Sequence, residues 1–191
     1  EKKGVDNLLR GLGQFARDGG TFEFTIAGDG PQRAALEAIA KEQHIHKYVK
    51  FLGAVENDRV RGLLQESDAF ALTCRDDSSG DRDGIPVVLM EAMACGLPVI
   101  SGDLPAIREL VAHEQSGLLV AGNDVDAIAR AVGLLANDQP TRNRLGAAGR
   151  QRVVDEFSLS ENVSRIETHL RKSLSISPVE VPIKVMAADE R

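Results

Sequence analysis

Aromatic side chains are scarce in this sequence, whose 191 residues include no tryptophan, one tyrosine and six phenylalanines. A folded core must therefore be built mainly from aliphatic side chains. Hydrophobic residues make up 42% of the chain and charged residues 27%, which is the usual balance of a globular domain. The length suits one α/β domain with an additional segment.

Cysteine is rare too, and no hydrophobic run is long enough to cross a membrane. Cys74 and Cys95 lie in or beside apolar segments, without metal-site or Cys-x-x-Cys spacing, so we interpret both as reduced core thiols. Reduced thiols favour a reducing compartment. The longest candidate for a membrane span, residues 84–102, is interrupted by Glu91 and contains two prolines. The sequence starts at Glu1 without a signal peptide, and we expect it to belong to a longer chain.

An excess of basic residues is also absent. The net charge is −6, with both signs interspersed, whereas a nucleic-acid-binding domain usually carries a basic stripe. We therefore expect no nucleic acid as a partner. Of the four histidines only His44 and His46 lie close in sequence, and we interpret that pair as the end of a solvated helix rather than a metal site.

Helical and strand patterns alternate along the chain with short links. Helical periodicity or start signals predict helices at residues 5–17, 31–44, 57–66, 86–95, 106–111, 124–136, 140–155 and 159–174. Short apolar runs predict strands at residues 22–27, 48–52, 68–73, 97–101 and 118–120. This order indicates an α/β fold, a Rossmann-like parallel sheet with helices on both faces. The predicted domain covers residues 1–174, and residues 175–191 form a tail or linker.

The most informative segment is residues 83–91, Asp-Gly-Ile-Pro-Val-Val-Leu-Met-Glu. Pro86 suits the first helical position, and the N–H groups of the next three residues would then point out of a helix start that favours phosphate. Glu91 is the only charged residue between Gly84 and Gly102, so we expect a buried carboxylate in an apolar helix. Two interpretations stay open, a structural ion pair or loop cap and an acceptor for ligand hydroxyl groups.

The sequence resembles the retaining family-4 glycosyltransferases in five segments that follow the family's order. Asp83 and Glu91, separated by seven residues, are similar to the family's Glu-seven-Glu motif. The other four segments are Lys-Lys-Gly-Val-Asp at residues 2–6, Ile-Ala-Gly-Asp-Gly-Pro at 26–31, Val-Lys-Phe-Leu-Gly at 49–53 and Gly-Leu-Leu-Val at 117–120. The resemblance covers residues 1 to about 170.

This resemblance implies the C-terminal, donor-binding half of a two-domain GT-B fold. The parent enzyme would transfer a hexosyl group from a UDP-, GDP- or ADP-sugar to an acceptor, with retention at the anomeric carbon. Its other implied partner is the N-terminal acceptor-binding domain of the same parent, which this sequence does not contain. The isolated chain would be inactive. We expect no cofactor and no metal, a role in polysaccharide biosynthesis, and a cytoplasmic location, with a membrane-peripheral role left open for the full-length protein.

Three residues receive catalytic roles from the resemblance. Glu91 corresponds to the carboxylate that binds the ribose hydroxyl groups of the donor. Asp83 corresponds to the acidic residue that approaches the hydroxyl groups of the donor sugar. Lys3 corresponds to the lysine that binds the diphosphate as it leaves. The structural alternative for Lys3 is a solvated terminal lysine.

The remaining assignments concern donor binding. The sugar or the distal phosphate would meet the backbone of four consecutive residues, Gly84, Ile85, Pro86 and Val87. The nucleobase would pack near Phe51 and Leu52, which must also serve as an ordinary core strand. Gly28 and Gly30 would form a close turn beside the donor cleft, and turn geometry alone is the alternative reading of both.

The sequence departs from the family pattern at several points. Asp83 is one methylene shorter than the usual Glu, and the family arginine that precedes the lysine lies outside the sequence. The family's Gly-Gly-x-Pro-Glu segment reads Gly-Asp-Leu-Pro-Ala at residues 102–106, with Glu109 as the candidate for the displaced acid. Asp81 and Asp83 also form an Asp-x-Asp pair that binds a metal in another glycosyltransferase fold, but the fold expected here favours a metal-independent mechanism.

Rival functions come from two other classes. The first is a non-catalytic nucleotide-sugar-binding module. The second is another GT-B reaction, such as nucleotide-sugar epimerisation or phosphorolysis, although no acid–base pair suited to epimerisation is evident. The sequence alone selects neither the base, the sugar nor the acceptor.

Overall fold

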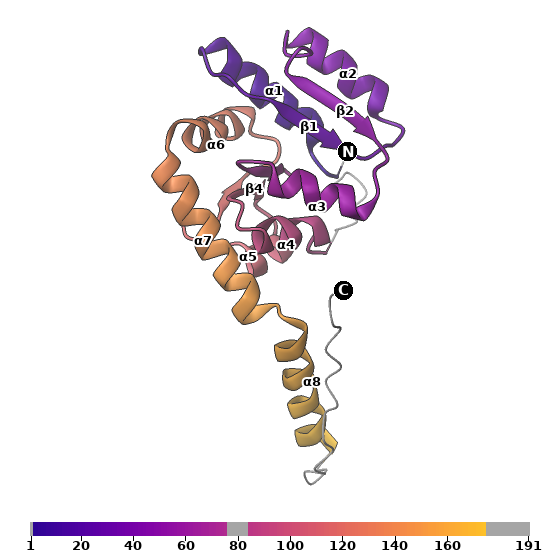
Figure 1. Ribbon diagram of the computed structural model, residues 1–191, viewed down its shortest axis with the longest axis vertical. Helices are drawn as coiled ribbons and strands as arrows, with labels where there is room; N and C mark the ends of the chain where they lie inside the picture. Colours follow the sequence, from indigo (N-terminus) through magenta and orange to yellow (C-terminus); the bar gives the residue numbers. More distant parts are fainter. Residues whose placement is uncertain (1, 76–83, 175–191) are drawn as a thin grey trace, which may run out of the picture. The chain divides into compact units, whose positions relative to one another are not determined.

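The computed structural model describes residues 2–75 and 84–174, which fall into two compact units, Glu1–Asp155 and Glu156–Arg191. The described residues form five strands, namely β1 (Phe24–Ala27), β2 (Val49–Gly53), β3 (Phe70–Leu72), β4 (Val99–Gly102) and β5 (Leu118–Val120). They form eight helices, namely α1 (Val5–Arg17), α2 (Arg33–Glu42), α3 (Asn57–Gln65), α4 (Val87–Ala94), α5 (Pro105–Leu110), α6 (Val125–Asn137), α7 (Gln139–Glu156) and α8 (Leu159–Leu174). Figure 1 shows this alternation along the first unit.

All strand pairs in the first unit are parallel, as the alternating pattern predicted. The hydrogen bonds define two sheets among the described residues, one of β1 and β2 and one in the order β3-β4-β5, instead of the single sheet expected. β3 has only three residues and offers a short ladder. The prediction of an α/β fold with parallel strands is therefore confirmed. The prediction of one continuous sheet is wrong for the described residues.

Helices cover the three-stranded sheet on both faces. Every residue of β4 is buried, which is typical of a strand that is covered on both sides. One cluster of buried aliphatic side chains joins α1, α2, α6 and α7 to the strands, and its members include Leu8, Leu9, Ile100, Leu118, Ile128 and Leu145. α4 packs on β3 and β4 and buries Leu89, Ala92 and Met93. The helix α4 is thus anchored on the sheet by one apolar face.

Arginines on α7 bind the carboxyl ends of neighbouring helices. Arg150 donates to the carbonyl of Ala94 at the end of α4, and Arg152 donates to the carbonyls of Glu109 and Leu110 at the end of α5. A positive charge there satisfies carbonyl groups that the helix leaves unpaired and complements its dipole. These contacts fix the end of α4 opposite to its start.

Several boundaries differ from those expected. Pro86 is the N-cap of α4 and not its first helical residue, and α2 begins at Arg33, two residues after Pro31. Asp124 caps α6, since its Oδ1 accepts a hydrogen bond of 2.8 Å from the N–H of Ala127. The first and last residues of a helix are difficult to predict exactly, because helix ends fray and the capping residue is only partly helical.

The second unit consists, in its described part, of the end of α7 and the helix α8. α8 exposes three apolar side chains at helical spacing, Val163, Ile166 and Leu170. The extent of the predicted domain, residues 1–174, stays a prediction, and the predicted tail, residues 175–191, lies outside the described residues. Among the helices of the described residues, none combines the length and apolarity needed to cross a membrane.

Candidate functional site

The N-terminal segment of the chain lies against the segment that follows β3. The N–H of Arg75 donates to the carbonyl of Lys2 at 2.9 Å, and the hydroxyl of Thr73 donates to the carbonyl of Gly4 at 2.9 Å. An ion pair of 2.8 Å joins Arg75 to Asp6. These bonds place the exposed residue Lys3 at the carboxyl edge of the three-stranded sheet, where ligands of open α/β sheets bind.

Glycines make this close approach possible. Gly4 has a φ of 65°, and a Cβ added there would collide with the backbone of Thr73. A Cβ on Gly102, the last residue of β4, would lie 2.6 Å from the carbonyl carbon of Cys74, and one on Gly122 would lie 2.6 Å from the carbonyl oxygen of Thr73. Three segments therefore converge on residues 73–74 with no room for side chains.

Glu91 is exposed, so the expectation of a buried carboxylate was wrong. α4 buries Leu89, Ala92 and Met93, and its opposite face presents Glu91 together with Val87, whose residue surface is 64% exposed. Glu91 and Val87 are separated by one helical turn and share a face. Across residues 2–75 and 84–174, no side chain forms an ion pair or hydrogen bond with Glu91. A structural ion pair within the described residues is therefore excluded as the role of Glu91.

The start of α4 offers backbone donors close to that carboxylate. The N–H of Leu89 bonds to the carbonyl of Pro86 at 3.0 Å, so this donor is not free, contrary to the expectation for three open N–H groups. The N–H groups of Val87 and Val88 find no acceptor among the described residues. Gly84, just before the helix, is exposed, and a Cβ there would meet nothing within 4 Å. Ile85 is half-buried and Pro86 buried. Asp83 and the Asp-x-Asp pair lie outside the described residues.

A second group of predicted residues meets at the carboxyl ends of β1 and β2. Gly28, with a φ of 130°, donates its N–H to the carbonyl of Gly53 at 2.8 Å. A Cβ on Gly28 or on Gly30 would meet nothing within 4 Å, which leaves the backbone of this turn accessible. A bulge in the pairing of β1 with β2 skips Leu52 and leaves it 41% exposed, whereas Phe51 is half-buried. Bulges often lie next to binding sites because they redirect a side chain.

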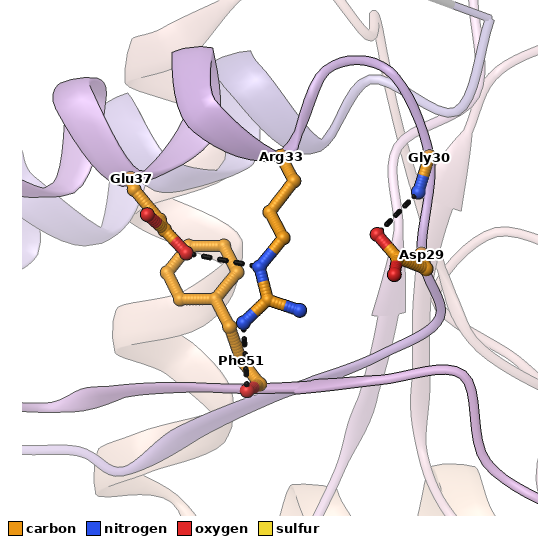
Figure 2. Close-up of polar contacts among 5 residues, drawn as sticks. All are labelled: Asp29, Gly30, Arg33, Glu37 and Phe51. Carbon is orange, nitrogen blue, oxygen red and sulfur yellow. Dashed lines mark hydrogen bonds and ion pairs between the residues drawn. The ribbon is translucent and has the colours of Figure 1, made fainter.

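Two charged residues in this second group were not predicted from the sequence. Figure 2 shows Arg33 donating to Glu37, at 3.0 Å, and to the carbonyl of Phe51, at 3.5 Å. Asp29 lies across from Arg33 on the turn and accepts the N–H of Gly30 at 2.8 Å. The sequence did contain a signal for a role of Arg33. Arg33 is a cation in the first turn of α2, where a positive charge opposes the helix dipole, and that turn has no acidic residue to balance it.

An open pocket of about 430 Å³ contains none of the predicted site residues. It is lined by Asp103, Arg108, Val111, Ala112, His113 and Leu119. Its polar groups already bind one another, because Arg108 makes two hydrogen bonds of 2.6 and 2.7 Å to Asp103, and the N–H of Leu119 donates to Nδ1 of His113. Arg108 thereby lowers the pKa of Asp103. We therefore place the candidate site at the carboxyl edges of the two sheets.

Solved glycosyltransferases share this fold. A sucrose-phosphate synthase from Thermosynechococcus elongatus is similar with a TM-score of 0.75 and 24% identity, covering 92% of this chain and 43% of the other. The C-terminal domain of a glycosyl transferase group 1 family protein from Francisella tularensis gives a TM-score of 0.72 and 18% identity, covering 83% of this chain and 81% of that domain. At these identities the likeness establishes the fold, that of a GT-B C-terminal domain.

Curated relatives are more similar in sequence. An amylovoran biosynthesis glycosyltransferase from Erwinia amylovora is 35% identical over 158 residues, 83% of this chain and 39% of the relative. A GDP-mannose-dependent alpha-(1-6)-phosphatidylinositol monomannoside mannosyltransferase from Mycobacterium tuberculosis is 33% identical over 171 residues, 89% of this chain and 44% of the relative. The chain thus spans less than half the length of these relatives. Residues 1–152 match the family of glycosyl transferases group 1, and the chain belongs to that family.

Proposed function

We propose that this chain is the donor-binding domain of a retaining, family-4 hexosyltransferase that uses a nucleotide diphosphate sugar. The observation that carries the proposal is Glu91, a carboxylate with no partner among the described residues, placed one turn after the start of α4. An unpaired carboxylate on a helix whose other face is firmly packed is available to a ligand. The open N–H groups of Val87 and Val88 lie at the same helix start.

In this proposal each part of the donor meets a complementary group. The two cis hydroxyl groups of the ribose donate to the two oxygens of Glu91, as a carboxylate accepts in pairs. The diphosphate approaches the start of α4, where backbone donors and the helix dipole favour anions. Lys3 supplies a positive charge to the diphosphate as the glycosidic bond to the sugar breaks. The exposed backbone of Gly84 faces the sugar or the distal phosphate.

The nucleobase binds, in the same proposal, at the second group of residues. Gly28 and Gly30 leave the turn after β1 open, and the bulged Leu52 offers an exposed apolar side chain beside Phe51. The names of similar proteins support a nucleotide diphosphate sugar as the donor. One relative is a GDP-mannose-dependent mannosyltransferase, and one similar structure, of a protein from Anabaena with 22% identity and a TM-score of 0.72, was solved with UDP-glucose.

The acceptor binds, we propose, to a part of the parent enzyme outside this chain. The relatives are more than twice as long as the region they share with it, which leaves room for an acceptor domain. Two relatives are named for amylovoran and colanic acid biosynthesis, which supports a polysaccharide precursor as the acceptor. The chain by itself is then expected to bind the donor and to transfer nothing. Asp83 keeps its predicted role next to the donor sugar.

Calorimetric titration of the 191-residue chain with GDP, UDP and ADP, with and without magnesium, tests the proposal. We expect one nucleotide to bind, without a requirement for magnesium, and Glu91→Ala to weaken that binding by about 30-fold or more, because two charge-assisted hydrogen bonds are lost. Glu66→Ala is the matched control, since Glu66 is an exposed carboxylate at the end of α3 whose ion-pair partner among the described residues is the exposed Arg59. A folded chain that binds none of the nucleotides, or binds one equally well in both variants, refutes the proposal.

A further inference from the structure

Arg33 is held in an unusual place for an arginine. It is the first residue of α2, where its charge opposes the helix dipole, and its side chain is 40% exposed. Glu37 binds its Nε at 3.0 Å and the carbonyl of Phe51 lies 3.5 Å from Nη2. These contacts hold the guanidinium at the carboxyl end of β2 (Figure 2). A guanidinium has five N–H donors, so several remain for another acceptor.

Asp29 approaches the same point from the end of β1. Its Oδ1 accepts the N–H of Gly30, which fixes the carboxylate. Oδ2 of Asp29 lies 3.9 Å, and Nη1 of Arg33 lies 3.1 Å, from the position that a Cβ on Gly53 would occupy. Asp29 and Arg33 nevertheless form no ion pair. Figure 2 shows them turned toward each other with no bond drawn between them. Free acceptors and free donors therefore face one small space.

Three glycines keep that space open. Gly28 and Gly53 have φ values of 130° and 72°, which only glycine adopts without strain. A side chain on Gly53 would press on Arg33, while Gly28 and Gly30 have nothing within 4 Å of a notional Cβ. The exposed, bulged Leu52 adds an apolar surface next to it. A flat ligand with polar edges fits this combination of open backbone, apolar contact and paired charges.

We propose that Asp29 and Arg33 select guanine as the base of the donor, an inference that rests on the proposed function. Guanine carries two adjacent donors, N1–H and the 2-amino group, which match the two oxygens of a carboxylate. It carries two adjacent acceptors, O6 and N7, which match the fork of an arginine. Asp29 accepts from the first edge and Arg33 donates to the second. The donor is then a GDP-sugar.

Uracil and adenine satisfy this pair less well. Uracil has a single ring N–H between two carbonyl oxygens, so one oxygen would face the carboxylate of Asp29. In adenine the acceptor N1 stands where guanine has N1–H, and an amino group replaces O6. Each mismatch leaves a charged group without a partner or against a like partial charge. A good bidentate contact discriminates between bases by about 10- to 100-fold, and we expect GDP to be preferred by at least that factor.

The test compares GDP, IDP, UDP and ADP by calorimetry on the 191-residue chain. IDP lacks only the 2-amino group, so it isolates the contact with Asp29. We expect the wild type to bind GDP about 10-fold more tightly than IDP and Asp29→Asn to bring that ratio close to one. Arg33→Gln should weaken GDP and IDP alike. Arg59→Gln, in an exposed arginine on α3, is the matched control, and circular dichroism verifies that each variant is folded.

The outcomes separate this inference from the proposed function. Tightest binding of UDP or ADP, lost in Glu91→Ala, overturns the assignment of guanine and leaves the donor site standing. Preference for GDP with an unchanged ratio of GDP to IDP affinity in Asp29→Asn also overturns it, because another group would then read the base. If no nucleotide binds the folded chain, both proposals fail together.

Discussion

Substitution of Gly102 by alanine should be among the most damaging small changes in this domain. Gly102 ends β4, which lies between β3 and β5 in the sheet. A Cβ there would come 2.6 Å from the carbonyl carbon and 3.0 Å from the nitrogen of Cys74, and closer still to the carbonyl oxygen. Since nonbonded carbon atoms prefer separations of about 3.5–4.0 Å, β4 or the segment after β3 must shift by about 1 Å.

The cost of that shift follows from what would have to move. Both partners are backbone, and the segment after β3 is bonded to the N-terminal residues through Thr73 and Arg75. Overpacking a well-packed region costs about 1–3 kcal/mol, and we expect Gly102→Ala to cost about 3 kcal/mol. Because the same segment positions Lys3 and leads toward α4, the affinity for nucleotide should fall as well.

Urea unfolding followed by circular dichroism measures this cost. With a typical slope of about 2 kcal/mol per molar urea, the midpoint should fall by about 1.5 M. Gly30→Ala is the control, since Gly30 has open space around it and no positive φ, and its midpoint should stay near that of the wild type. If Gly102→Ala unfolds at the same urea concentration as Gly30→Ala, the close approach of β4 to Cys74 does not constrain the fold, and our reasoning is refuted.

Three further changes test other contacts. Asp124→Ala should destabilise the fold by about 1 kcal/mol in urea unfolding through loss of the cap of α6, and Asp124→Asn should restore most of it; equal losses would contradict the capping role. Arg152→Ala should lower the free energy of unfolding by about 1 kcal/mol, because α5 loses the donor to its last carbonyl groups. Arg152→Lys should restore only part of that stability, and an Arg152→Ala variant as stable as the wild type would contradict this capping role. The hydrogen bond from Arg108 lowers the pKa of Asp103 below its ordinary value of 3.8, so the stability it provides is present above that value and is lost as pH falls through the lowered pKa. An NMR titration should show a higher pKa for Asp103 in Arg108→Gln, and an unchanged pKa would rule this cause out.

Helices and strands that glycine residues bound in the sequence were predictable from it. α1 covers residues 5–17 and β5 covers residues 118–120, both as predicted. Gly19 and Gly20 follow α1 closely, and Gly117 directly precedes β5. The contact between residues 2–6 and residues 73–75 was not predictable, since it joins groups 69 residues apart through a hydroxyl, a carbonyl and one ion pair. No local propensity encodes such a contact. The positions of Lys3 and Gly102 therefore required the structure.

The error at Glu91 has a simple physical origin. The apolar composition of α4 suggested a helix buried all around, but a helix of two turns packs on a sheet with one face. Leu89, Ala92 and Met93 form that face, and Val87 and Glu91, four residues apart, lie on the other. The four-residue spacing of Val87 and Glu91 indicated an exposed helix face, which the apolar composition of α4 did not. An exposed valine beside an unpaired carboxylate is also what a ligand with apolar and hydroxyl parts would meet.

The exposure of the candidate site bears on what the chain does alone. Glu91, Val87, Leu52 and the two glycines of the turn after β1 all face solvent in the described structure. Hydrogen bonds and charges stabilise a leaving diphosphate strongly only where water is excluded. A nucleotide bound here would keep one side wet, so we expect the chain to bind its donor modestly and to transfer no sugar. In the two-domain parent enzyme that we propose, a covering surface from the second domain would exclude that water, and we therefore expect such a parent to bind the donor more tightly than this chain does, before any acceptor is present.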